Sequence, residues 1–198
     1  MLKAFGRAAA LFFVLATAVP AAAQYSDSYN FLKAVRERNP TKVTELLAVP
    51  GTAVVNIKDP GSGEAALHIV VKGRDYEWLS FLLSKRATPN IQNRQGETPL
   101  SVAAQLGWTE GAELLLIRGA GVDVPNQRGE TPLIFAVHRR DLAMVSLLLR
   151  GGANPNRKDN MSGYSALDYA RQDGRSQAIV KLLESQAGPA RPAAGPKL

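Results

Sequence analysis

The side chains that most often carry out chemistry are scarce in this sequence. It contains two histidines, His68 and His138, and no cysteine. A zinc site needs several His, Cys or carboxylate ligands at short spacings, and the two histidines lie far apart in the chain. The absence of cysteine excludes disulfides, thiolate metal sites and cysteine nucleophiles. We therefore expect no metal site, and we interpret His138, which precedes Arg139 and Arg140, as a surface residue.

A serine between two glycines, Gly61-Ser62-Gly63, comes closest to a nucleophile motif. It lacks the Gly-x-Ser-x-Gly frame and the preceding strand of a nucleophile elbow. No phosphate-binding loop pattern occurs, and the carboxylates are scattered without an outstanding pair. An enzyme needs a cluster of titratable groups in a pocket. The sequence therefore indicates a protein that is not an enzyme and that needs no cofactor.

The residues that do recur belong to one repeated stretch. Residues 93–100, Asn-Arg-Gln-Gly-Glu-Thr-Pro-Leu, return 33 positions later in residues 126–133, and more loosely at residues 160–167 and 63–68. Pairs of leucines keep nearly the same step, at positions 82–83, 115–116, 148–149 and 182–183. A fixed period of about 20 to 50 residues is typical of a stacked array of structural repeats.

Each copy carries the signals for two short helices. Thr98 and Thr131 stand directly before a proline. Threonine caps the free N–H groups at a helix start, and proline is tolerated at the first helical position. Gly107 and Gly174 are expected to end the first helix in a left-handed conformation. The leucine pair lies in a second helix, and the Asn-x-x-Gly stretch that follows suits the tip of a β-hairpin.

The period and these residues together resemble the ankyrin repeat. The pattern of that family is a turn with Gly, then Thr-Pro-Leu-His, a small pair, a Gly, and finally Leu-Leu with Gly-Ala two residues later. The resemblance implies an all-α solenoid of about five helix-turn-helix repeats with β-hairpin fingers. We expect these repeats at about residues 25–55, 56–90, 91–123, 124–156 and 157–186. In this family His68 occupies a position that bridges neighbouring repeats through backbone hydrogen bonds.

The second repeat departs from the pattern. Ala65-Ala66 stands where Thr-Pro belongs, and losing such a cap costs about 1 kcal/mol. Arg74 replaces the glycine that ends the first helix, so this repeat is expected to be among the softer ones. The link over residues 51–62 is longer than its counterparts, and is either a tolerated insertion or an enlarged contact finger. The residues expected to pack in the interior are Ile69, Trp78, Val102, Trp108, Phe135 and Tyr169.

The two ends of the chain differ from its body. Residues 1–23 have the pattern of a secretory signal peptide, with two cations, an apolar run over residues 8–19 and the small residues Ala21-Ala22-Ala23. The run is too short to span a bilayer. We expect cleavage between Ala23 and Gln24, followed by export to a bacterial periplasm or to the outside. Residues 187–198 hold three prolines without an apolar period, and we expect a disordered tail there.

The charge of the body argues against nucleic acid as a partner. The formal net charge is +7, and the signal segment and the tail each contribute two cations without an acid. The repeat domain over residues 24–186 is therefore only mildly basic and mixed in sign. Nucleic-acid-binding domains carry a concentrated basic patch or stripe.

The resemblance implies a protein partner that binds the hairpin tips and the exposed ends of the first helices. Four of these positions are expected to form a basic centre and three to add apolar area, so we expect a partner with an acidic contact patch. The basic centre is Arg94, Arg128, His138 and Arg139; the apolar positions are Leu106, Met161 and Tyr164; and Gln95, Gln105 and Gln127 complete the face.

We therefore expect an exported, non-enzymatic and monomeric protein-interaction module. It would bind no nucleic acid, and no membrane after the signal is removed. An adaptor, a stabiliser and an inhibitor of another exported protein are all compatible with the sequence. The alternatives are a self-associating structural element, through an insufficiently polar last helix around Ile179, and, least favoured, an enzyme.

Overall fold

The computed structural model describes residues 21–48 and 54–187, and in this part of the chain paired α-helices account for nearly all regular structure. In chain order the elements are α1 (Ala21–Arg36), α2 (Pro40–Leu47), the 3₁₀ helix η1 (Val54–Asn56), α3 (Ala66–Lys72), α4 (Tyr76–Ser84), α5 (Pro99–Leu106), α6 (Thr109–Ile117), α7 (Pro132–His138), α8 (Leu142–Arg150), α9 (Ala166–Asp173) and α10 (Gln177–Ala187). The expected all-α repeat solenoid is confirmed.

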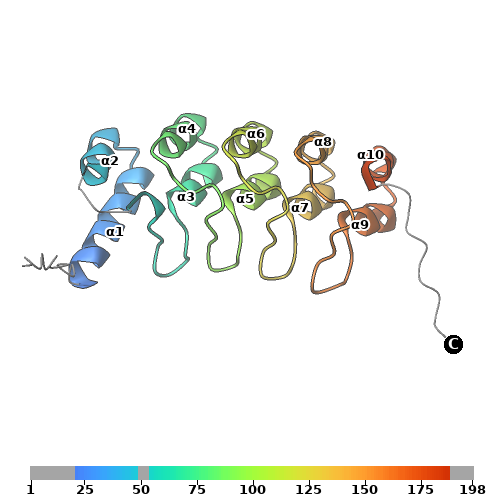
Figure 1. Ribbon diagram of the computed structural model, residues 1–198, viewed down its shortest axis with the longest axis horizontal. Coiled ribbons are helices and arrows are strands. Elements are labelled where there is room, and N and C mark those ends of the chain that lie inside the picture. Colours follow the sequence, from blue (N-terminus) through green and yellow to red (C-terminus); the bar gives the residue numbers. More distant parts are fainter. Residues whose placement is uncertain (1–20, 49–53, 188–198) are drawn as a thin grey trace, which may run out of the picture.

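The helices stack in two rows. Figure 1 shows α1, α3, α5, α7 and α9 side by side in one row, with α2, α4, α6, α8 and α10 in a second row above it. Loops project from the first-helix row on the side away from the second-helix row. The two helices of each repeat pack together, each first helix packs against the next first helix, and α4, α6, α8 and α10 pack in series. Stability in such an array comes from contacts between neighbouring repeats.

The first helices begin as the sequence predicts. Thr98, Thr131 and Ser165 are the N-cap residues of α5, α7 and α9, and each side-chain oxygen accepts a hydrogen bond from the amide three residues later. Pro99 and Pro132 occupy the first helical position. These bonds satisfy N–H groups that have no partner inside the helix.

The second repeat lacks this cap, and a histidine makes a different hydrogen bond at its helix start. Ala65 precedes α3 and has no side-chain acceptor. Its own N–H instead donates to Nδ1 of the buried His68 at 3.1 Å, and Nε2 of His68 lies 2.9 Å from the carbonyl oxygen of Glu97 in the next repeat. Since Nδ1 accepts, Nε2 carries the proton and donates to that carbonyl. The expected bridging role of His68 is confirmed.

The first helices end on left-handed residues. Gly107 and Gly174 have φ values of 67° and 64°, as expected, and Arg74 adopts φ 50° where its counterpart is Gly107. Arg38 and Arg140 do the same with φ 53° and 56°. Each of these arginines reaches the following repeat: Arg38 pairs with Asp75, Arg74 donates to the carbonyl of Leu106, and Arg140 pairs with Asp173. The substitution at position 74 therefore adds a contact between repeats.

The second helices bury the leucine pairs unequally. Leu82, Leu115 and Leu148 are completely buried, whereas in α10 it is Leu183, the second of its pair, that is completely buried and Leu182 that is half-buried. Both tryptophans are buried, as expected. Of the row expected in the interior, Val102 is buried, and Ile69, Phe135 and Tyr169 are half-buried.

The projecting loops are tight turns, which we call fingers 1 to 4: residues 59–64, 93–97, 126–130 and 159–164. In each, the first residue donates its N–H to the carbonyl of the last. The sequence predicts β-hairpins here, but within the described residues the pairing is limited to isolated bridges, Lys58 with Ala65 and Lys158 with Ser165. The fingers are held by side-chain and inter-finger bonds, as shown below.

The chain ends are only partly covered by the described residues. Helix α1 begins at Ala21 and so runs through the expected cleavage position after Ala23, while the rest of the expected signal peptide lies outside the described residues. The expected tail lies outside them too, apart from Ala187, which ends α10. Within the described residues, no helix is both long and apolar enough to cross a membrane.

Candidate functional site

Each finger is built around the side chain of its first residue. Oδ1 of Asn93 accepts the amides of Gln95 and Glu97, both at 2.9 Å. Asn126 does the same in finger 3. Asn and Asp commonly fold the chain back in this way. The turn geometry therefore exists before any partner arrives.

The two end fingers use aspartate and are one residue longer. Asp59 accepts the amides of Gly61 and Ser62, and Asp159 accepts those of Met161, Ser162 and Gly163. The hydrogen bond from the Ser62 amide is the main reason why the pKa of Asp59 lies below its usual value. Although burial opposes it, the bonds from Tyr169 and from the finger amides also lower the pKa of Asp159. Both side chains are therefore anions at neutral pH.

Neighbouring fingers are joined through their backbones. The N–H of Arg94 donates to the carbonyl of Ser62 at 3.1 Å. The same bond recurs from Gln127 to Gln95 at 3.0 Å and from Asn160 to Arg128 at 2.8 Å. We call this series the finger ladder. It fixes the fingers as a rigid row, which reduces the ordering cost when a partner binds.

Glycine makes the finger ladder sterically possible. A methyl group at Gly63, Gly96 or Gly129 would lie 2.7, 2.8 or 2.6 Å from the amide nitrogen of the next finger. All of these glycines also have positive φ. The glycine shared by every finger is thus required by the turn and, in fingers 1 to 3, by the neighbouring finger as well.

The basic centre expected from the sequence is largely engaged within the protein. Nη2 of Arg94 donates to the carbonyl of Pro60, and Nη2 of Arg128 pairs with Glu130 at 2.9 Å. The guanidinium of Arg139 lies against Gly107, close to where a side chain at that position would stand. These arginines are exposed, but carboxylates alternate with them along the fingers. The face is mixed in charge, and the acidic contact patch expected of the partner stays a prediction.

The glutamates that end fingers 1 and 2 each bind a side chain at the end of the first helix. Glu64 pairs with Lys72, and Glu97 accepts a hydrogen bond from Gln105 at 2.7 Å. Glu130, in contrast, pairs with Arg128 of its own finger. In the fourth repeat the position equivalent to Gln105 is occupied by His138. The expected site residue Gln105 is therefore half-buried and holds a carboxylate in place.

The face becomes aromatic at its C-terminal end. The ring of His138 packs on Tyr169 with centroids 4.5 Å apart, and Tyr164 meets Tyr169 edge-on at 5.5 Å. The hydroxyl of Tyr169 donates to the carboxylate of Asp159, which raises the pKa of the tyrosine. Beside this cluster, Met161 is 75% exposed and Tyr164 is 41% exposed. The sequence predicted Tyr169 only as an interior residue. The other members of its row are Ile, Val and Phe, so the hydroxyl of Tyr169 was the feature that could have indicated a polar role.

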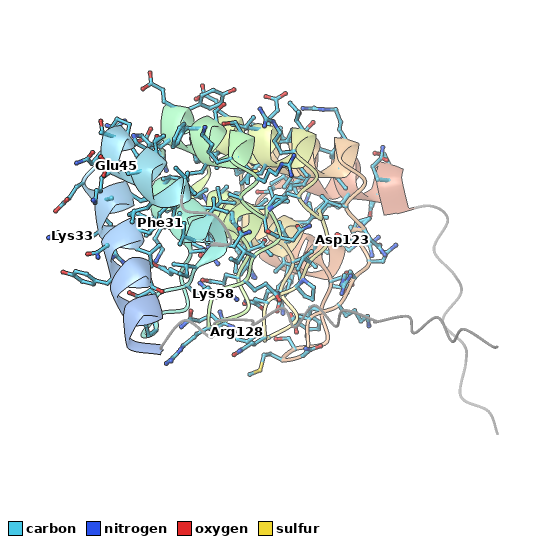
Figure 2. The ribbon with its side chains drawn as sticks, turned by 60° about the vertical axis from the view of Figure 1, so that its left-hand side comes forward. Phe31, Lys33, Glu45, Lys58, Asp123 and Arg128 are labelled. Carbon is cyan, nitrogen blue, oxygen red and sulfur yellow. The ribbon has the colours of Figure 1, made fainter. Side chains whose placement is uncertain are left out.

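The remaining expected residues have smaller roles. Gln95 and Gln127 are exposed at their tips, and Nε2 of Gln127 donates to the carbonyl of Arg94. Leu106 is half-buried at the end of α5, and its carbonyl accepts from Arg74. The structure thus places the predicted residues on fingers 2 to 4 and at the C-terminal ends of α5 and α7. Figure 2 shows Arg128 at the finger edge, with Lys58, which directly precedes finger 1, on the same side.

Among the described residues, no group of three or more His, Cys, Asp or Glu side chains is placed to hold a metal ion. Burial lowers the pKa of His68, whose ring nitrogens are both engaged in structural bonds. What the finger face can do is present fixed polar, charged and aromatic groups to another molecule.

Comparison with known proteins shows similarity to a protein family and to a curated relative. The sequence profile of the family described as "Ankyrin repeats (3 copies)" matches residues 31–126 and 110–191. The transient receptor potential cation channel subfamily A member 1 homolog of Caenorhabditis elegans is 36% identical over 73 residues, which is 37% of this chain and 6% of that protein. The match therefore spans a small part of that relative.

Proposed function

Because the chain belongs to the ankyrin repeat family, we propose that it is a non-enzymatic protein that binds one protein partner through its fingers and the exposed ends of its first helices. Ankyrin repeats generally mediate protein–protein interaction. The observation that supports this face most directly is the finger ladder, which holds the fingers in one rigid row. The exposed Met161 and Tyr164 give that row the apolar area that interfaces use as anchors.

We propose further that the protein acts after export. Its sequence begins with the pattern of a secretory signal peptide, and the first buried side chains that the structure describes, those of Ser28 and Phe31, lie after the expected cut. Cleavage after Ala23 would leave every described buried side chain in place. In the periplasm or outside the cell, the role would be that of an adaptor, stabiliser or inhibitor of another exported protein. N-terminal sequencing of the protein from fractionated cells should give Gln24; an intact start in the cytoplasm would exclude export.

A pull-down with the full chain tests the binding function. The bait should be run beside the double variant Met161→Ala/Tyr164→Ala and beside Ile117→Ala. Ile117 is 72% exposed on the second-helix row, so it controls for the loss of an equally exposed apolar side chain on the opposite side. We expect one stoichiometric partner that is retained by Ile117→Ala and reduced at least tenfold by the double variant. Equal recovery with all baits would show that the finger face is not the binding surface.

A further inference from the structure

The two ends of the finger ladder differ: finger 1 has no N–H donor at the ladder position, whereas finger 4 has an acceptor there without a donor among the described residues. In fingers 2 to 4, the residue after the leading Asn or Asp donates its N–H to the preceding finger. The equivalent residue of finger 1 is Pro60, which has no N–H. At the other end, Ser162 occupies the position of the accepting residues Ser62, Gln95 and Arg128. No described residue donates to its carbonyl.

Finger 4 has the same backbone conformation at its glycine as the fingers that bind a following finger. Gly163 has φ +68°, close to the 72°, 77° and 80° of the glycines that face a neighbouring finger. Yet no described atom lies within 4 Å of the place where a side chain at Gly163 would stand. Finger 4 therefore presents an unused acceptor and the clearance that a further backbone needs. The exposed Met161 and Tyr164 belong to the same finger.

We infer that the free edge of finger 4, formed by the Ser162 carbonyl and Gly163, binds a turn or extended segment of a partner protein, which donates a backbone N–H to Ser162 and covers Met161 or Tyr164 with an apolar side chain. This inference rests on the proposed binding function and names the contact by which the partner docks. Adding a backbone to an exposed edge is a general mode of peptide recognition.

The chemistry of the ladder indicates what kind of partner fits. The donors inside the array are Arg94, Gln127 and Asn160, which share only their backbone N–H. Recognition at this edge is thus by the backbone, with apolar contacts adding affinity. A second copy of this chain is a poor occupant, because its own first finger has Pro60 at the donor position and its other donors are engaged. The occupant is therefore a different polypeptide with an unpaired backbone amide.

A defined probe can test the edge before any partner is known. The probe is a head-to-tail cyclised peptide of residues 124–131, which contains the donor Gln127. The matched control is the same peptide N-methylated at Gln127, which lacks only the donor. Methyl-labelled methionine in the full chain gives the readout, because Met161 is exposed in finger 4 and Met144 is completely buried in α8. The peptide should shift the Met161 signal saturably at millimolar concentration and leave Met144 unmoved.

Two substitutions separate the edge from a general effect on stability. Gly163→Asn places a side chain in the open space, and Asn tolerates the left-handed conformation. Gly174→Asn, at φ 64° and with nothing described within 4 Å, is the same change away from the fingers. We expect Gly163→Asn to weaken the peptide at least tenfold, Gly174→Asn to leave it unchanged, and the N-methyl peptide to cause no shift. Equal shifts with both peptides, or full binding by Gly163→Asn, would overturn the inference.

The same variants distinguish this inference from the proposed function. In the pull-down, a partner that is lost with Gly163→Asn and kept with Gly174→Asn supports both. A partner that is kept with Gly163→Asn but lost with Met161→Ala/Tyr164→Ala overturns the docking edge and leaves the proposed function standing. Failure to recover any specific partner removes the proposed function, and the inference falls with it.

Discussion

The N–H of Asn160 donates to the carbonyl of Arg128 at 2.8 Å, directly beside Gly129, where a methyl group would lie 2.6 Å from the same nitrogen. The bond and the glycine are therefore coupled: each bond of the finger ladder requires a glycine directly after the accepting residue. Since Gly129 also has φ 80°, an alanine there is unfavourable for two separate reasons.

Gly129→Ala should lower the free energy of unfolding by about 3 kcal/mol, of which about 1–2 kcal/mol is the left-handed conformation and the rest is the displaced finger. Gly152→Ala is the control, because Gly152 has φ 87° and nothing described within 4 Å. Gly152→Ala should lower the free energy of unfolding only by the cost of the left-handed conformation, about 1–2 kcal/mol. Chemical denaturation of both variants measures the difference, and equal losses would show that the close approach of finger 4 contributes nothing to stability.

A second glycine, Gly111, leaves room for the ring of a buried tryptophan. Gly111 lies inside α6, and a methyl group there would meet the ring of the buried Trp108 at 2.2 Å. Alanine is favoured over glycine in a helix by about 1 kcal/mol, yet Gly111→Ala should destabilise the protein by about 1–3 kcal/mol because the ring has to move. The tryptophan fluorescence should shift as well.

Gly73→Ala separates the steric effect from helix propensity. Gly73 has φ −77°, and a methyl group there would make only ordinary contacts of 3.6 Å. This variant should be neutral or slightly stabilised in thermal unfolding. If Gly111→Ala is as stable as Gly73→Ala, the packing of Trp108 against the helix is looser than the structure indicates.

The parts of the fold that local chemistry controls could be predicted from the sequence. Thr98 and Thr131 cap their helices because the cap, the proline and the helix are adjacent in the chain. Gly107 ends α5 in the left-handed conformation for the same reason. The repeat period extends these local results along the array, since each repeat meets its neighbour in the same way.

Contacts between repeats could not be predicted to the same extent, because they depend on how closely neighbouring backbones approach. The finger ladder requires knowing that Gln127 lies against Gln95. The engagement of Arg94 with the carbonyl of Pro60 and of Arg128 with Glu130 likewise depends on side-chain directions, which a count of charges in the sequence does not contain.

A second inter-repeat series did leave a trace in the sequence. Side chains at a repeated position at the base of the fingers accept the amide of a residue in the next repeat: Asn56 from Thr88, Asn90 from Gly121 and Asp123 from Asn154. Their spacing follows the repeat period. Searching the period for recurring Asn and Asp, as well as for leucine pairs, would have revealed this series.

Restoring the cap of the second repeat should stabilise the protein. Ala65 occupies the N-cap position of α3 without a side-chain acceptor, and in α9 the same position holds Ser165, which accepts the Asp168 amide at 3.2 Å. Ala65→Ser should raise the free energy of unfolding by about 0.5–1 kcal/mol. Ala48→Ser, at the C-terminal end of α2, controls for adding a hydroxyl to the chain. No gain relative to that control in urea denaturation would mean that the backbone N–H of His68 is already satisfied by the carbonyl of Ala65.

His68 should make the stability of the array depend on pH. Its pKa lies below the ordinary value of 6.5, because burial disfavours the charged ring. The unfolded chain therefore binds the proton more readily, so the stability that His68 contributes is present above pH 6.5 and is lost as the pH falls below it. The carboxylates Asp59 and Asp159, whose pKa values are also lowered, lose their contribution only at more acidic pH.

His68→Gln tests this directly, because glutamine does not titrate. The variant should be less stable than the natural chain by about 1–3 kcal/mol at pH 7, where the bonds to Ala65 and Glu97 are broken or weakened. Its stability should then change less between pH 7 and pH 5, so the two unfolding curves converge on acidification. His138→Gln, the same change at an exposed position, controls for the loss of a histidine from the chain. If His68→Gln and the natural chain lose the same free energy between pH 7 and pH 5, protonation of His68 does not limit the stability of the junction between the second and third repeats.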